Sequence, residues 1–415
     1  MKKIVVIGGG AAGMFFSIFA AKNGHQVTLI EKNEKLGKKL FITGKGRCNF
    51  TNQCSQEEFL SNVVTNPKFL YSAIAACDSA AVIRDFEDWG MPVKVERGNR
   101  AFPASDHSSD VIKTLEQQMK KQQVEVRLFS EAKRIVTRDG CAAGVVICRN
   151  GSEELLEADA VVIATGGLSY PSTGSTGDGY RMAEETGHRV TECRPSLVPI
   201  ICSDEYCRVM QGLFLKNVSL VMKSGKKIRY TGFGEMMFTH FGITGPLVLS
   251  ASAKAGAWIG QEDLNTWIDL KPALSEEMLE NRLIRMAESF PNKDLINTLG
   301  ELYPAKMVPV IPELAGVNPR VKMRELTRKE RLALIRVTKQ FPLHPVSLRG
   351  YQEAVVTKGG VSVKDVNPKT MESKKTQGIY LIGEVLDLDA YTGGFNLQIA
   401  WATAYAAAEA LKEDI

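Results

Sequence analysis

A glycine-rich turn between two short apolar segments is the feature that most constrains how this chain can fold. The apolar residues 3–7 lead into the sequence GGGAAG at residues 8–13, and a second apolar run at residues 26–30 ends at Glu31. In a strand–turn–helix unit of this kind, the three glycines allow a tight turn, the approach of a pyrophosphate to the backbone, and close helix packing. The helix N-terminus attracts phosphate, and an acid placed like Glu31 accepts hydrogen bonds from a ribose. We therefore predict an adenine dinucleotide site on a Rossmann-like fold.

Length and charge limit the other possibilities. A chain of 415 residues predicts two or three domains. The net charge of +5, from 52 basic and 47 acidic side chains, is mild and shows no basic block, so we expect no nucleic-acid partner. No run of about eighteen apolar residues is present, which indicates no membrane partner. The oligomeric state stays open.

Cysteine and histidine usage indicates the compartment and argues against a metal. Eight cysteines are scattered without a C-x-x-C pair, and the five histidines lie far apart. This pattern is typical of reduced thiols in a cytoplasmic protein and predicts no metal site. The apolar stretch after Lys2 and Lys3 could belong to a secretory leader, but three consecutive glycines interrupt it, so we expect none.

Two later segments decide between a nicotinamide and a flavin. Glu31 disfavours NADP because its charge repels a 2′-phosphate. Residues 159–167 and 378–384 each read as a buried strand that opens into a glycine turn, and the second ends at Glu384, before a glycine pair and a final helix. Flavin proteins of the glutathione-reductase class use such strand ends to hold FAD, with the acid on the ribityl chain and the helix N-terminus at the isoalloxazine O2. The pattern therefore favours FAD.

Four further segments carry a family resemblance. They are TGKGRCNFTN at residues 43–52, TGGLSYP at 165–171, FTHFGITGP at 238–246 and GEVLD at 383–387. Together they resemble the BaiN/YhiN-like flavoproteins, a family often labelled "aminoacetone oxidase family" or "NAD(FAD)-utilizing dehydrogenase". The likeness spans essentially the whole chain. It implies that residues 46–49 wrap the FAD near its pyrophosphate and ring, and that Ala132 presents its backbone to adenine.

The expected architecture is an α/β Rossmann-like FAD-binding fold of the glutathione-reductase class, interrupted by a β-rich domain with a small helical insert. Residues 195–255 alternate in short runs that indicate β-structure, whereas residues 274–290 and 325–338 have helical patterns. The expected boundaries are 1–194 and 350–415 for the FAD-binding domain, 195–260 and 335–349 for the β-rich substrate domain, and 261–334 for the helical insert.

These interpretations give one set of expected FAD contacts. Arg47 could neutralise the pyrophosphate or polarise a flavin carbonyl, or lie on the surface. Cys48 could take part in redox chemistry, although the lack of a resolving cysteine at C-x-x-C spacing favours a small residue packed beside the cofactor. The whole set is Gly8, Gly10, Ala11, Ala12, Gly13, Glu31, Lys32, Lys39, Gly44, Gly46, Arg47, Cys48, Asn49, Ala132, Ala164, Thr165, Gly166, Gly383, Glu384, Gly394, Phe395, Asn396 and Leu397.

Two residues are candidates for catalysis. His240 lies in an aromatic, glycine-rich segment and could act as a general acid or base, or be a hydrogen-bonded core histidine. Arg100 belongs to a compact Arg-x-Phe-Pro patch and could bind an anionic substrate, or form an ordinary ion pair in a loop.

The sequence thus predicts a soluble, cytoplasmic FAD-dependent oxidoreductase that acts on a small organic substrate. No second glycine fingerprint provides a separate nicotinamide domain, so NAD(P)H would bind transiently over the flavin, or the substrate itself would reduce the flavin. The alternatives are a flavoprotein that acts on tRNA, an amine oxidase that uses oxygen, and a redox-responsive binding module with little turnover. The identity of the substrate stays open.

Overall fold

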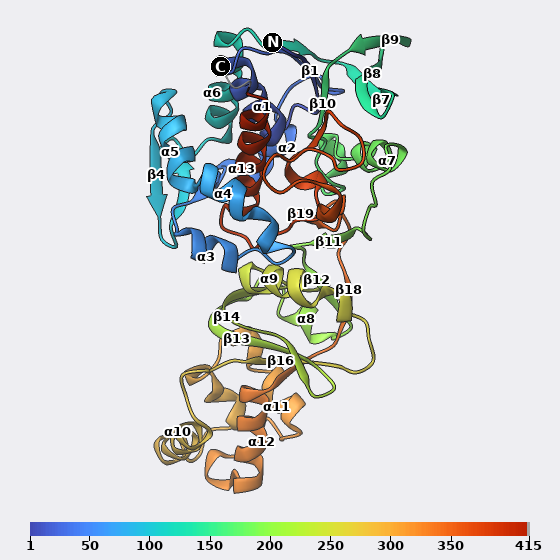
Figure 1. Cartoon of the computed structure of the whole chain (residues 1–415). Coiled ribbons are helices and arrows are strands. Elements are labelled where there is room, and N and C mark those ends of the chain that lie inside the picture. Colours follow the sequence, from blue (N-terminus) through green and yellow to red (C-terminus); the bar gives the residue numbers. More distant parts are fainter. Residues whose placement is uncertain (413–415) are drawn as a thin grey trace. The chain divides into compact units, whose positions relative to one another are not determined.

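The computed structural model describes residues 1–412, which form two compact units. Unit 1 combines residues 1–196 with the segment that begins at Tyr351, and unit 2 consists of residues 197–350. Figure 1 shows the blue N-terminal part and the red C-terminal part of the chain in the same unit. Unit 1 is therefore discontinuous in sequence. The finer division of the inserted segment into a β-rich domain and a helical insert stays a prediction.

A five-stranded parallel sheet forms the centre of unit 1. Its order is β20-β10-β1-β2-β6. All residues of β10 and β20 are buried, as expected for a parallel sheet that is covered on both faces. The sheet confirms the predicted Rossmann-like fold class. The strands are β1 (Lys3–Ile7), β2 (Gln26–Ile30), β6 (Glu125–Arg127), β10 (Ala160–Ile163) and β20 (Ile379–Leu381).

Two helices pack against each other in the core of unit 1. α1 (Ala11–Lys22) contacts α13 (Phe395–Ala410), and the rings of Phe15 and Trp401 lie 5.1 Å apart. Trp401 is fully buried, and its Nε1 donates a hydrogen bond to the Phe50 carbonyl over 2.8 Å. The many alanines of α13 leave room for such bulky neighbours. The apolar final helix is thus a core element.

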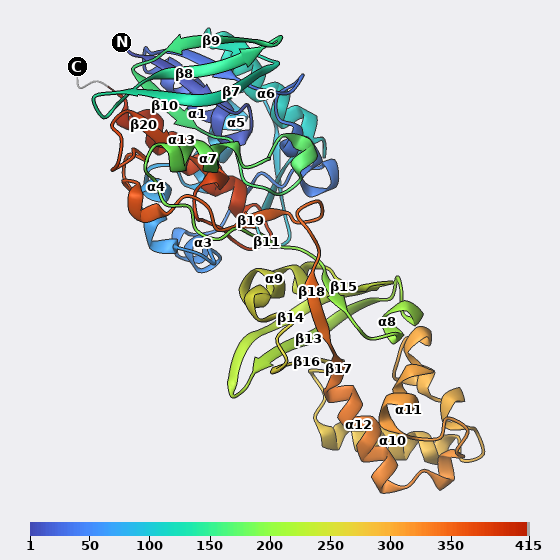
Figure 2. The same ribbon diagram turned by 90° about the vertical axis from the view of Figure 1, so that its right-hand side faces the viewer.

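An antiparallel meander of β7, β8 and β9 extends unit 1, and Figure 2 shows the three strands side by side. Their two connections, Asp139-Gly140 and Asn150-Gly151, have positive φ at all four residues, which Asp-Gly and Asn-Gly turns favour. The other elements of unit 1 are α2 (Lys38–Ile42), β3 (Thr51–Asn52), α3 (Gln56–Ser61), α4 (Tyr71–Ala76), α5 (Ser79–Asp88), β4 (Val93–Glu96), β5 (Arg100–Pro103), α6 (Ser108–Lys121), β7 (Ser130–Arg138), β8 (Cys141–Arg149), β9 (Ser152–Glu157), α7 (Asp178–Glu185), β11 (Arg194–Ser196) and β19 (Val356–Lys358).

Unit 2 is built on a seven-stranded antiparallel sheet. Its order is β17-β16-β13-β14-β15-β12-β18, and the long hairpin of β13 and β14 lies at its centre. The strands are β12 (Ile200–Cys202), β13 (Phe214–Ser224), β14 (Lys227–Thr239), β15 (Gly242–Thr244), β16 (Leu264–Asp269), β17 (Phe341–Leu343) and β18 (Pro345–Leu348).

The expectation of β-structure throughout residues 195–255 is wrong in part. The sequence forms α8 (Tyr206–Val209) and α9 (Pro246–Ala255) within this stretch. Gly245, with φ of +104°, ends the strand pattern, and Pro246 occupies the first helical turn, where its missing N–H costs nothing. Alanine, leucine and serine then continue the helix, and α9 packs on the sheet.

The helical patterns in the second half of unit 2 are confirmed. The helices are α10 (Glu276–Ser289), α11 (Val310–Ala315) and α12 (Arg328–Lys339). Ser275 caps α10, and Thr327 with Glu330 forms a capping box at the start of α12. Among residues 1–412, no helix is long and apolar enough to cross a membrane.

Candidate functional site

A cleft of about 1350 Å³, counting the part that is open to solvent, lies at the carboxyl edge of the parallel sheet in unit 1. Its lining includes residues that directly follow four strands: 8–10 after β1, 31–33 after β2, 164–166 after β10, and Ile382 and Glu384 after β20. β2 pairs with one side of β1 and β10 with the other, so the strand order reverses at β1. Open α/β sheets bind their ligands at such a switch point.

The turn after β1 has the geometry that an approaching pyrophosphate requires. Gly8 has φ of +109°, and a Cβ at this position would lie 2.6 Å from the carbonyl oxygen of Ala164. A Cβ at Gly13 would lie 2.0 Å from the Gly8 carbonyl oxygen, so this glycine allows α1 to approach the turn. At Gly10, in contrast, a Cβ would meet nothing within 4 Å. Gly10 caps α1 without a side chain, which leaves the N–H groups of the first helical turn available to a ligand.

Glu31 is held in place by groups of the same edge. Its Oε2 accepts a hydrogen bond from the Gly9 N–H over 2.9 Å, and its Oε1 accepts from the Asn33 N–H and Nδ2 over 2.9 and 2.7 Å. A carboxylate has about four acceptor positions, so acceptor capacity remains for ribose hydroxyls. Asn33 lines the cleft as well and was not among the predicted residues.

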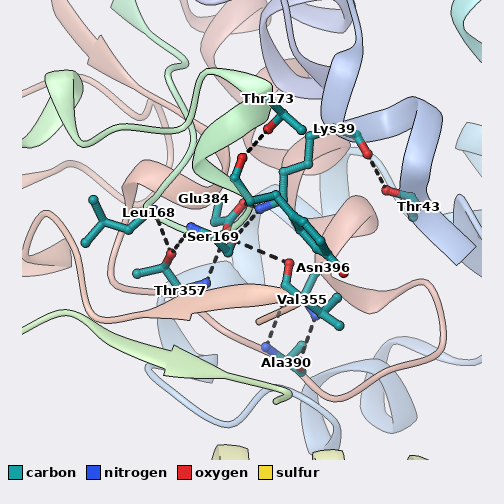
Figure 3. A network of polar contacts seen from close by, with 11 residues as sticks. Lys39, Thr43, Leu168, Ser169, Thr173, Val355, Thr357, Glu384, Ala390 and Asn396 are labelled. Carbon is teal, nitrogen blue, oxygen red and sulfur yellow. Dashed lines mark hydrogen bonds and ion pairs between the residues drawn. The ribbon is translucent and has the colours of Figure 1, made fainter. Parts of the chain in front are cut away.

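The second acid of the cleft is Glu384, which follows the edge strand β20 and belongs to the polar network drawn in Figure 3. Lys39 donates from Nζ to Glu384 Oε2 over 2.6 Å and to Ser169 Oγ over 2.5 Å. Glu384 Oε1 accepts from Ser169 Oγ and from the Thr357 N–H, both over 2.9 Å. Thr357 Oγ1 in turn accepts from the Leu168 N–H over 2.8 Å. The network fixes the carboxylate of Glu384 on the wall of the cleft.

The N-terminus of α13 completes this end of the cleft. Gly394, with φ of +96°, caps the helix without a side chain, and a Cβ there would lie 2.4 Å from the Thr51 carbonyl oxygen. Asn396 and Leu397 line the cleft. The amide of Asn396 is engaged with its own loop, because Oδ1 accepts from the Ala390 N–H and Nδ2 donates to the Ala390 carbonyl. The side chain of Asn396 therefore shapes the loop before α13.

The profile of the HI0933-like protein Rossmann domain family matches residues 2–410. The chain belongs to this family.

The protein has relatives of nearly the same length. It is 33% identical over 411 residues to the ribosomal RNA dihydrouridine synthase of Escherichia coli (strain K12), and the match covers 98% of this chain and 97% of that protein. It is 30% identical over 417 residues to the 3-dehydro-bile acid delta(4,6)-reductase of Clostridium scindens, with 100% of both chains covered. The resemblance inferred from the four sequence segments is thereby confirmed.

Solved structures share the fold. The 3-ketosteroid-delta4-(5alpha)-dehydrogenase from Rhodococcus jostii RHA1 superposes with a TM-score of 0.55 at 16% identity, over 99% of this chain and 96% of that one. The 3-ketosteroid delta1-dehydrogenase from Sterolibacterium denitrificans gives a TM-score of 0.53 at 14% identity, over 98% of both chains. Identities this low show the fold alone.

The protein is an FAD-dependent oxidoreductase. The cleft fits the cofactor, because a glycine turn open at Gly10, an acid after β2, an acid after β20 and an uncapped helix N-terminus line one continuous space. Of the predicted contacts, the cleft brings together Gly8, Gly10, Ala11, Ala12, Glu31, Lys32, Lys39, Ala132, Ala164, Thr165, Gly166, Glu384, Asn396 and Leu397. Outside its lining are Gly13, Gly44, Gly46, Arg47, Cys48, Asn49, Gly383, Gly394 and Phe395.

Arg47 lies in an ion-pair cluster. Its guanidinium contacts Glu96 and Asp106 and stacks on the Phe102 ring, 4.3 Å from the ring centroid. The hydrogen bond from Arg47 lowers the pKa of Glu96, and hydrogen bonds from Lys94 and Arg47 lower the pKa of Asp106. Both carboxylates are therefore charged at neutral pH, and they neutralise Arg47. A contact between Arg47 and the cofactor stays a prediction.

The other candidates for chemistry are not among the residues that line the cleft. Cys48 is fully buried, and burial raises the pKa of its thiol, which suits a packed residue rather than a thiolate. Arg100 is exposed and donates from Nε to the Arg97 carbonyl over 3.0 Å. His240 is an exposed residue of unit 2, between β14 and β15, with its ring edge-on to Phe241. Catalytic roles for Arg100 and His240 stay predictions.

Several lining residues were missed by the sequence analysis. One group comes from the turn at residues 173–178, where Lys32 donates to Asp178 Oδ2 over 2.6 Å. The sequence GSTGDG at 174–179 is a glycine-rich signal that could have indicated this turn. Val355 and Val356 also line the cleft, and no local motif marks them.

A cluster in unit 2 has the residue types of a metal site. Among residues 1–412, the ligand atoms of Cys202, Asp204 and Cys207 lie within 4.8 Å of one another. Asp204 is already engaged, since its Oδ1 lies 2.6 Å from His344 Nδ1. The expectation that the protein has no metal site stays a prediction.

Proposed function

We propose that this protein reduces a carbon–carbon double bond that is conjugated to a carbonyl group. The observation that carries the proposal is a chemistry common to relatives that match along their whole length. One is named for making dihydrouridine, which is uridine with its ring C=C bond saturated next to a ring carbonyl, and the other for reducing the conjugated double bonds of a 3-oxo bile acid. Reduction of such a bond adds a hydride to the carbon remote from the carbonyl and a proton to the carbon beside it.

The residues of the cleft would hold FAD, which supplies the hydride when it is bound and reduced. We assign the pyrophosphate to Gly8–Ala12 and the N-terminus of α1, and the adenosine ribose to Glu31. Glu384 would accept hydrogen bonds from the ribityl chain, because Lys39 and Ser169 fix its carboxylate on the wall of the cleft. The N-terminus of α13 would stabilise negative charge at the carbonyl edge of the flavin.

We assign NAD(P)H as the source of electrons. A reductase needs a separate donor, because its organic substrate accepts the hydride rather than giving it. Unit 1 has one glycine turn of the dinucleotide type, which we assign to FAD. The nicotinamide would therefore bind transiently at the flavin. The amine-oxidase alternative predicts the opposite direction of transfer, from substrate to flavin and then to oxygen.

Anaerobic flavin spectroscopy separates these possibilities. We expect NADH or NADPH to bleach the flavin absorbance of the purified holoprotein, whereas a panel of primary amines leaves it unchanged. A 3-oxo steroid with a conjugated double bond, or a uridine-containing RNA, should then restore the absorbance and gain two hydrogens by mass spectrometry. A flavin that amines bleach and NAD(P)H does not would refute the proposal. So would a flavin that oxygen reoxidises and no conjugated substrate does.

A further inference from the structure

The positive charge of the chain is concentrated in unit 2. Residues 197–350 contain 21 Lys or Arg and 15 Asp or Glu, a net charge of +6, whereas the remaining residues contain 31 and 32, a net charge of −1. The mild total of +5 conceals this asymmetry. Such an imbalance between parts of a chain indicates a polyanionic partner for the basic part.

Within unit 2, the β13–β14 hairpin carries the densest cluster of basic residues. Lys216, Lys223, Lys226, Lys227 and Arg229 fall within fourteen residues, and Glu235 is the only acid between Phe214 and Thr239. None of the four lysines forms an ion pair with a residue of the described chain. Elsewhere in the unit, Lys322 is paired with Asp294 over 2.7 Å and Lys339 with Asp269 over 2.6 Å. The charges of the hairpin are thus available to an external anion.

The same hairpin exposes aromatic rings. Phe233 is 65% exposed and Phe214 is 42% exposed. Phe233 lies on the outer face of β14, because the alternate residues Tyr230 and Met236 are buried. The inner face is covered by α9, since a Cβ at Gly232 would lie 2.8 Å from Leu247. The hairpin thus carries exposed aromatic rings and unpaired lysines on the same element.

We propose that the β13–β14 hairpin binds single-stranded RNA and thereby makes a base in RNA the substrate of the reductase. Lysines attract the phosphate backbone, and exposed aromatic rings stack on unpaired bases. A small apolar substrate would gain nothing from four lysines, and duplex RNA keeps its bases away from aromatic side chains. The inference rests on the proposed reduction of a conjugated double bond, because the uracil ring supplies such a bond.

Fluorescence anisotropy with a labelled single-stranded oligouridine tests this surface on the FAD-loaded protein. We expect saturable binding that weakens with salt. The triple variant Lys223→Gln, Lys226→Gln, Lys227→Gln should lower the affinity at least tenfold and reduce the slope of log K against log salt by about two, since each phosphate contact contributes about 0.7 for a single strand. Phe233→Ala should weaken binding by about five- to hundredfold, and Phe233→Tyr should restore it.

A matched control removes the same charge from another part of unit 2. Arg320, Lys329 and Arg336 are exposed, and their replacement by Gln also lowers the net charge by three. If this control weakens binding as much as the hairpin triple, or if the wild-type protein prefers duplex RNA or anionic vesicles, the proposed surface is wrong. Competition with unlabelled duplex and with vesicles of anionic lipid provides those comparisons.

The binding assay tests the proposed surface and the reductase assay tests the proposed function, so each hypothesis can be refuted without the other. If the wild-type protein binds RNA, the hairpin variants do not, and no conjugated substrate is reduced, the surface is upheld and the proposed function is refuted. Reduction of a conjugated steroid by a protein that binds no RNA would uphold the reductase chemistry and refute the surface. Flavin reduction by NAD(P)H should be unchanged in every hairpin variant.

Discussion

Gly10 and Gly13 lie three residues apart, and the structure predicts opposite effects for the same substitution. Gly10 has φ of −86°, which alanine adopts freely, and a Cβ there would meet nothing within 4 Å. Alanine is a poorer helix cap than glycine but reduces the entropy of the unfolded chain, so the stability of the apoprotein should change by less than about 1 kcal/mol. The new methyl group would instead occupy the space assigned to the pyrophosphate. Loss of two charge-assisted hydrogen bonds would cost about 3–6 kcal/mol, a fall in FAD affinity of about a hundredfold or more.

Gly13→Ala should show the reverse pattern. Its Cβ would lie 2.0 Å from the Gly8 carbonyl oxygen, which is backbone and cannot rotate away, so the apoprotein should lose about 1–3 kcal/mol or more of stability. Urea unfolding of both apoproteins and titration by quenching of FAD fluorescence separate the two effects. A Gly10→Ala protein that binds FAD as tightly as the wild type would refute the assignment of the pyrophosphate to this turn.

Three further predictions follow from the cleft and the core. Glu31→Gln should lower FAD affinity about tenfold or more in the same titration, because a ribose hydroxyl loses a charged acceptor, while urea unfolding of the apoprotein changes little. Glu384→Gln should destabilise the apoprotein by about 1–3 kcal/mol, because it leaves the half-buried Lys39 ammonium without its counter-charge, and equal unfolding midpoints for variant and wild type would contradict the network. Burial raises the pKa of Asp85 to about 6, so the folded state holds its proton more tightly than the unfolded state, and its contribution to stability falls as pH rises from about 4 to 6. Asp85→Asn should therefore be more stable than the wild type at pH 7 and equal to it below pH 4, as measured by thermal melts across pH.

The sequence predicted the cleft well where one local segment specifies one local geometry. Most of the lining residues after β1, β2, β10 and β20 were expected, because a buried strand followed by a glycine or an acid is visible in a few consecutive residues. Gly9, Asn33 and Ile382 were not. The roles of Gly8 and Gly13 follow from the same pattern, and the contacts of a Cβ at each position agree with them.

Contacts that depend on distant segments could not be read in this way. Val355 and Val356 reach the cleft because β19 pairs with β11, a strand about 160 residues earlier in the chain, and nothing near Val355 signals that pairing. Arg47 illustrates the converse. Its loop is conspicuous in sequence, but Glu96 and Asp106, which neutralise it, lie about fifty and sixty residues further along. The sequence of a motif shows which charged residue is present, but it does not show which distant residue pairs with it.

The residues assigned to FAD and the β13–β14 hairpin belong to different units of the chain. Every residue assigned to FAD belongs to unit 1, and relatives named for an RNA base and for a bile acid match this chain over its whole length. A cofactor cleft accounts for the proposed reduction, and it does not by itself select between two substrates of such different size and charge. We infer that the choice of substrate depends on residues outside the cofactor cleft. In this chain, the unpaired lysines and the exposed Phe233 of the β13–β14 hairpin are the feature with a definite chemical preference, and that preference is for a polyanion that carries unpaired bases.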